Sequence, residues 1–198
     1  MSRGTFITLL GVNNIGKSTQ VRMLAERIEK EGGRVQSIKY PCYHCMQTGP
    51  MLDAYLRKGN PDKLSAREFQ LLNVINRTYR EQNILPLLAE GKHVIAEDYT
   101  GTGIAWGIGT GVEKDFLLKI NHHLAVEDLA ILIDGEPFFE GEEERHAHEN
   151  NRKLIEHVRN IHHDLASEFG WKVVSANRPR EEVHEEIWRY VLPVIERE

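Results

Sequence analysis

Short apolar runs alternate along the chain with longer segments in which apolar residues recur every three or four positions. A brief apolar, β-branched run is typical of a buried strand. Five such runs predict strands: Thr5–Leu10, Val35–Tyr40, His93–Ala96, Leu129–Ile133 and Trp171–Ser175. Strands that alternate with helices indicate a parallel sheet with helices on both faces. We therefore expect an α/β fold in a single domain over residues 1–198, which is enough chain for a sizeable core.

The segments between these runs carry helix signals at their ends. Four segments predict helices: Lys17–Glu31, Ser65–Leu88, Arg152–Phe169 and Pro179–Ile195. Ser65 is a suitable cap for the second helix, and the proline and acidic residues that open the last one are typical of helix starts. Gly32 and Gly33 end the first helix.

The segment Gly135–Asn151 is too polar to pack into a core. It lies between the fourth predicted strand and a helix. One interpretation is a solvated loop. Its position after that strand is equally suited to a short lid over phosphates, spanning about residues 135–151. The pattern alone leaves both interpretations open.

Composition narrows the class of protein. A charge of −5 over 198 residues argues against nucleic acid or a membrane surface as partner, since both usually require a basic face. No apolar run is long enough for a membrane span, and no signal-peptide pattern opens the chain. Two cysteines, Cys42 and Cys45, are too few for a disulfide scaffold, so we expect a cytoplasmic protein with reduced thiols.

The strongest chemical motif is Gly11-Val-Asn-Asn-Ile-Gly16-Lys17-Ser18, which matches the phosphate-loop pattern GxxxxGK[ST]. It stands between a predicted strand and a predicted helix, as that pattern requires. Glycines let consecutive N–H groups point at one anion, and the helix adds its positive N-terminal end. Lys17 is then placed to reach the β- and γ-phosphates, while the Ser18 hydroxyl can ligate Mg²⁺. The motif predicts a nucleoside triphosphate site in a three-layer P-loop NTPase fold.

Two acids, Glu97 and Asp98, follow the third predicted strand. Carboxylates at a strand end beside a phosphate loop commonly hold Mg²⁺ or its water ligands. Capping of the next turn is the alternative. We favour a metal or catalytic role for this pair, without assigning it to one of the two acids.

Four segments together resemble the thymidylate kinase family of P-loop nucleoside monophosphate kinases, from about residue 3 to about residue 190. They are GTFITLLGVNNIGKSTQ, YPCYHCMQTGPMLDAYLRKG, LLNVINRTYREQNILPLLAEGKHVIAEDY and EERHAHENNRKLIEHVRNIHHDLA. The resemblance implies ATP-dependent phosphorylation of dTMP with Mg²⁺, a homodimer and a small nucleotide as the partner. It implies ATP contacts from Gly11, Asn14, Gly16, Lys17, Ser18 and Thr19, and metal contacts from Ser18 and Glu97.

The resemblance also implies catalytic roles for Lys17, Glu97 and Arg145. The residues between the two loop glycines carry no basic side chain, and members with such a loop supply positive charge from the lid. This gives weight to Arg145, with Arg152 and Lys153 as substitutes. The acceptor nucleotide would meet Asn73, Arg77, Asp98, Tyr99 and Trp106.

Departures from the family pattern concentrate on the acceptor side. Cys42 and Asp98 stand where the family has arginines that face the acceptor phosphate, and Asn73 stands where an aromatic ring stacks on the thymine. Each lost bond to a charged phosphate is worth about 1.5–3 kcal/mol. Lys39, His44 and Arg57 are the candidates for compensation.

Three interpretations therefore stay open. The chain is a dTMP kinase with relocated cations, a kinase for another nucleotide or nucleoside, or a nucleotide-binding paralogue with little catalysis. The intact Lys17-Ser18 pair argues against the third. We favour the first interpretation.

Overall fold

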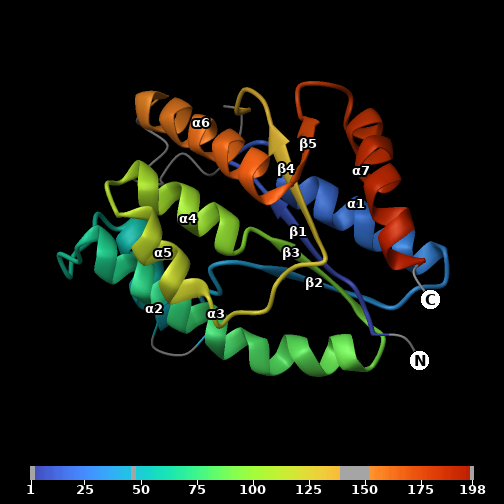
Figure 1. Ribbon diagram of the computed structural model, residues 1–198, viewed down its shortest axis with the longest axis horizontal. Coiled ribbons are helices and arrows are strands. Elements are labelled where there is room, and N and C mark those ends of the chain that lie inside the picture. Colours follow the sequence, from blue (N-terminus) through green and yellow to red (C-terminus); the bar gives the residue numbers. More distant parts are fainter. Residues whose placement is uncertain (1–2, 46–47, 139–151, 197–198) are drawn as a thin grey trace.

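The computed structural model describes residues 3–45, 48–138 and 152–196 (Figure 1). The strands are β1 (Phe6–Leu10), β2 (Val35–Lys39), β3 (His93–Glu97), β4 (Leu129–Asp134) and β5 (Lys172–Ser175). They form one parallel sheet in the order β2-β3-β1-β4-β5. Each predicted strand is present, with bounds within one residue of those expected.

Seven helices connect and flank the strands in the described part of the chain. They are α1 (Lys17–Lys30), α2 (Thr48–Arg57), α3 (Ala66–Ala89), α4 (Thr100–Gly109), α5 (Lys114–Asn121), α6 (Arg152–Phe169) and α7 (Arg180–Ile195). The prediction of helices on both faces is confirmed: α1 and α7 cover one face, while α3 and α4 lie on the other, with α5 and α6 packed against α4 (Figure 1).

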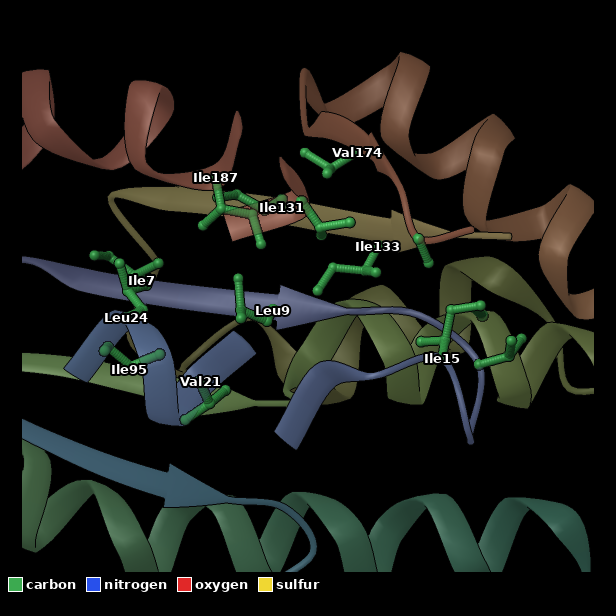
Figure 2. Close-up of a cluster of buried hydrophobic side chains, with 14 of the residues drawn as sticks. Ile7, Leu9, Ile15, Val21, Leu24, Ile95, Ile131, Ile133, Val174 and Ile187 are labelled. Atoms are coloured by element: carbon green, nitrogen blue, oxygen red, sulfur yellow. The ribbon is translucent and has the colours of Figure 1, made fainter. Parts of the chain in front are cut away.

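The alternation of side chains along the strands divides the core between the two faces. Ile7 and Leu9 of β1 point toward α1 and α7, where Leu24 and Ile187 meet them (Figure 2). Phe6 and Leu10 of the same strand belong to the cluster on the α3 face. Because both faces are covered, β1 is buried at every position.

Three of the helices, α2, α4 and α5, were not among those predicted from the sequence. By contrast α3 begins where expected, because Ser65 and Glu68 form a reciprocal capping box. Helix α4 has the sequence TGTGIAWGIG, whose glycines disfavour a helix in isolation. Its glycines instead admit neighbouring side chains at close range, so tertiary packing outweighs local propensity.

Candidate active site

The phosphate loop connects β1 to α1 at the carboxyl edge of the sheet. Gly11 and Gly16 have φ values of +139° and +87°, and Asn14 has a φ of +56°. A Cβ atom on Gly11 would lie 2.4 Å from the carbonyl oxygen of Ile133, so only glycine fits there. The loop thus has the strand-to-helix context that the motif predicted.

Lys17 is the first residue of α1, and it folds back across this loop. Its Nζ donates to the carbonyl oxygens of Gly11 and Val12, at 3.0 and 2.6 Å. The side chain is buried, and its Nζ lies 3.6 Å from Oδ1 of Asp98. The ammonium group is therefore held over the loop that the sequence assigns to phosphate.

Glu97 ends β3 beside the start of α1. Parallel pairing places it opposite Leu9 in β1 and Lys39 in β2. The Ser18 hydroxyl donates to Oε1 of Glu97 at 2.8 Å, and Nζ of Lys39 lies 2.9 Å from the same oxygen. Two oxygen groups that suit Mg²⁺ are thus adjacent, and Glu97 rather than Asp98 is the acid that meets Ser18.

Asp98 has a different environment from its neighbour. Its backbone has a φ of +60°, which aspartate tolerates better than most residues. Its carboxylate accepts a hydrogen bond from the Thr102 hydroxyl at 2.9 Å and faces Lys17. Burial raises the pKa of Asp98, and the charge of Lys17 opposes that shift. Asp98 therefore joins the start of α4 to the phosphate loop.

Arg77 lies on α3 and is 3% exposed. Its Nη1 donates to Oδ1 of Asn121 on α5 at 3.0 Å, and burial lowers its pKa. Asn73, one turn earlier on α3, donates from Nδ2 to the carbonyl oxygen of Phe69. The Asn73 side chain thus bonds back to its own helix.

Tyr99 is fully buried beside this region. Its ring packs edge-on against Phe6, and its hydroxyl donates to Glu81 at 3.3 Å. Burial raises the pKa of Tyr99 well above its ordinary value. These contacts anchor Tyr99 in the core. Its contact with the acceptor stays a prediction.

One cavity of about 290 Å³ connects the phosphate loop to Arg77. Most of the predicted site residues line it: Asn14, Gly16, Lys17, Ser18, Thr19, Asn73, Arg77, Glu97, Asp98, Tyr99 and Trp106. Gly11 belongs to the phosphate loop but does not line the cavity. Arg145 lies outside the described residues, as does most of the predicted lid, and its role stays a prediction.

Several lining residues were not assigned to the site from the sequence. Phe69 contributes an aromatic ring that stacks on Tyr55 with centroids 3.9 Å apart. Of the candidates for compensation, Lys39 and Arg57 line the cavity, and Arg57 lies over the ring of Tyr43. No motif could identify Phe69, because its place depends on how α2 packs against α3.

The cysteines depart from the expectation of reduced thiols. Cys42 and Cys45 form a disulfide in the loop between β2 and α2. The loop turns back on itself there, with the amide of Cys45 donating to the carbonyl oxygen of Cys42, and this brings the two sulfur atoms together. Asn76 holds the same loop through both backbone groups of Cys42. Among the described residues no three His, Cys, Asp or Glu side chains are grouped so that they could hold a metal ion.

Comparison with known proteins places this chain in a family. The family model described as thymidylate kinase matches residues 10–187. The chain belongs to the thymidylate kinase family. The match covers the phosphate loop, the β3 acids and Arg77, so the resemblance inferred from the four segments is confirmed.

Curated members of the family match over nearly the whole chain. A thymidylate kinase of Halothermothrix orenii is 31% identical over 96% of this chain and 97% of its own length. A probable thymidylate kinase of Pyrococcus abyssi is 32% identical over 93% of this chain and 94% of its own. The human thymidylate kinase is 28% identical over 93% of this chain and 88% of its own.

Solved structures of the family share the fold. The thymidylate kinase of Candida albicans superimposes with a TM-score of 0.81 at 21% identity, covering 98% of this chain and 93% of its own. That of Ehrlichia chaffeensis gives a TM-score of 0.77 at 19% identity, covering 96% and 99%. The predicted P-loop NTPase fold is thereby confirmed. In the described residues, no helix combines the length and apolarity that crossing a membrane demands.

Proposed function

We propose that this protein transfers the γ-phosphoryl group of ATP to dTMP, forming ADP and dTDP. The observation that carries the proposal is that one continuous cavity has a phosphate loop at one end and the buried cation Arg77 at the other. Such a cavity holds donor and acceptor in one space, which is what direct transfer between them needs. Membership of the thymidylate kinase family supports dTMP as the acceptor.

The residues present fit Mg²⁺, because the Ser18 hydroxyl and the Glu97 carboxylate are oxygen donors that already lie 2.8 Å apart. Ser18 and Glu97 would hold the ion, directly or through its water ligands. When bound, Mg²⁺ offsets negative charge on the phosphates. The two side chains therefore fit Mg²⁺ in the type of ligand atom and in lying next to each other.

In the proposed reaction, an oxygen of the dTMP phosphate attacks the γ-phosphorus in line while the bond to the β–γ bridging oxygen breaks. The acceptor oxygen is already anionic, so little acid–base chemistry is required. Lys17 would exchange its contacts with the loop carbonyls for phosphate oxygens and offset their charge. We propose that Arg145 adds a second cation from the lid.

The test is a coupled ADP-release assay with ATP and Mg²⁺ against a panel of nucleoside monophosphates and nucleosides. Turnover with dTMP well above the others supports the proposal. Preferred turnover with another acceptor replaces dTMP in it. Tight ATP binding without turnover of any acceptor identifies a nucleotide-binding paralogue instead.

A hydroxyl acceptor, as in a nucleoside, is the second candidate. The observation that favours it is Asp98, a largely buried carboxylate that lines the cavity next to Lys17. Burial raises the pKa of Asp98, which makes it a better base. A hydroxyl must lose a proton as it attacks phosphorus, whereas a phosphate acceptor has no such need.

The Asp98→Asn variant separates these two acceptors. Asparagine tolerates the positive φ and can still accept the Thr102 bond, so the fold should persist. With a dianionic acceptor, loss of the Asp98 charge should lower the KM for dTMP about tenfold with little change in kcat. With a hydroxyl acceptor, loss of the base should lower kcat by about a hundredfold.

Initial-rate kinetics against dTMP and thymidine measure this difference. Asp62→Asn, an exposed aspartate that does not line the cavity, is the matched control. A raised KM for dTMP in Asp98→Asn would contradict the idea that the Asp98 charge opposes acceptor binding.

We also propose a homodimer and a cytoplasmic location. Leu71, Ile75 and Leu85 lie along one side of α3 and are 41, 54 and 49% exposed. A second copy of the chain would remove this apolar stripe from water. Sedimentation equilibrium measures the oligomeric state, and a monomer at micromolar concentration would overturn the dimer. The cytoplasmic location is proposed from membership of the thymidylate kinase family.

A further inference from the structure

Arg77 is a buried cation that forms no ion pair among the residues that the structure describes, although the charge of Asp98 acts on it from farther away. It is 3% exposed, and its Nη1 forms a hydrogen bond to Asn121. Its Nε is buried and has no hydrogen-bond partner in the described part of the chain. Burying an unpaired charge is costly, so a guanidinium in this setting calls for a group that holds it in place.

Asn121 is the last residue of α5 and is 7% exposed. Its Nδ2 donates to the carbonyl oxygen of Leu117 at 2.8 Å, one turn earlier on the same helix. That bond determines the orientation of the amide, because only the nitrogen can donate. The oxygen Oδ1 therefore faces Arg77 and accepts from Nη1 at 3.0 Å.

The guanidinium of Arg77 also packs closely against Gly103. A Cβ atom on this residue of α4 would lie 2.2 Å from Nη2 of Arg77 and 3.0 Å from its Cζ. The guanidinium thus occupies space that any side chain at position 103 would take. Helices α4 and α5 each contribute one of these contacts. The Arg77 side chain also lines the active-site cavity, as Gly103 of α4 does.

We propose that Asn121 is a positioning residue that holds Arg77 toward the acceptor in the active-site cavity. The inference rests on the proposed function, because it assigns the acceptor end of that cavity to Arg77. A neutral partner suits this role, because an amide oxygen orients one N–H group without forming an ion pair with Arg77. A carboxylate at the same place would form an ion pair and weaken the attraction for an anionic acceptor.

Steady-state kinetics of Asn121→Ala and Asn121→Asp test the proposal. Asn121→Ala should raise the KM for the acceptor about tenfold, since Arg77 loses its anchor, while the KM for ATP stays unchanged. Asn121→Asp should raise the acceptor KM at least as much, because the new carboxylate neutralises Arg77. His122→Ala, the exposed neighbouring position, is the matched control. A merely structural role would lower Tm and change the kinetics of both substrates together.

Gly103→Ala tests the same contact from the other side. Alanine favours a helix more than glycine does, so the fold should persist, yet its methyl group must displace the Arg77 guanidinium. The acceptor KM should rise about tenfold with no loss in Tm. An unchanged acceptor KM in both Gly103→Ala and Asn121→Ala would overturn the proposal.

A double-mutant cycle identifies the route of the effect. In an Arg77→Ala background, Asn121→Ala should have no further effect on the acceptor KM, because the group that it positions is gone. An equal rise in KM in that background would show that Asn121 acts independently of Arg77, and would overturn the positioning role.

The outcome is separable from that of the proposed function. If another acceptor is preferred over dTMP, the same KM comparison applies to that acceptor. If the wild-type protein phosphorylates no acceptor, a crystal structure of Asn121→Ala without nucleotide decides. The guanidinium is expected to leave its wild-type position, and an unmoved Arg77 would overturn the inference whatever the reaction proves to be.

Discussion

Lys17→Ala is expected to lower kcat by about 10³-fold or more while the protein stays folded. In the structure the Lys17 ammonium is held over the phosphate loop by two carbonyl oxygens, those of Gly11 and Val12. In the proposed reaction it meets the β- and γ-phosphates, where charge is greatest during transfer. Removal of one preorganised stabilising group typically costs about 10²–10³ in rate, and a full positive charge in a buried site is worth at least that.

The measurement is ADP release under saturating ATP and acceptor, together with thermal unfolding. Lys30→Ala, an exposed lysine at the far end of α1, is the matched control and should retain wild-type kcat. Loss of kcat with a Tm close to wild type supports the assignment. A kcat within tenfold of wild type would mean that the phosphate loop does not serve the transferred group.

Strands β1 and β4 were predictable because helices cover both faces of the sheet where these strands lie. A strand buried on both faces reads as a continuous apolar run, as in FITLL of β1 and LAILI in β4. Helix α3 was predictable at its start for a local reason, the capping box of Ser65 and Glu68. These signals lie within a few residues of sequence.

Helix α4 could not be predicted in this way, because the contacts that stabilise it are made with residues far away in the sequence. A Cβ atom on Gly101 would lie 2.7 Å from Trp171, and one on Gly109 would lie 2.5 Å from Val158. Glycine is locally a helix breaker, but here it lets α4 closely approach α6 and Trp171, the residue before β5. Only the folded structure shows that this close packing outweighs the low helix propensity of glycine.

In the candidate site, too, some contacts were predictable from the sequence and others were not. The approach of a β3 acid to Ser18 was predictable, since parallel strands end at one edge of a sheet and the phosphate loop leaves that edge. The structure shows that this acid is Glu97. Asn121 carries no motif, and its contact with Arg77 spans 44 residues of sequence. The contacts around Arg77 therefore could be found only in the structure, whereas the sequence motif was enough to predict that the phosphate loop and a β3 acid lie together.

Glu97→Gln should lower kcat by about 10²–10³-fold and raise the Mg²⁺ concentration needed for half-maximal rate. Glutamine has nearly the same shape, and its amide oxygen can still accept the bond from Ser18, so the variant isolates the charge. A neutral amide attracts a divalent cation far less than a carboxylate does. The ion pair between Glu97 and Lys39 is lost as well, which makes the charge beside the phosphates more positive.

Initial rates measured over a wide range of Mg²⁺ at fixed ATP separate these two consequences. If Glu97 organises the ion, high Mg²⁺ should restore part of the lost rate, and Glu29→Gln, an exposed acid on α1, should behave like wild type. If the ion pair with Lys39 matters instead, Lys39→Ala should reproduce the loss and Mg²⁺ should restore nothing. A Mg²⁺ curve for Glu97→Gln that superimposes on the wild-type curve would remove Glu97 from the metal site, and leave it as the acid that holds Ser18 and Lys39 in place.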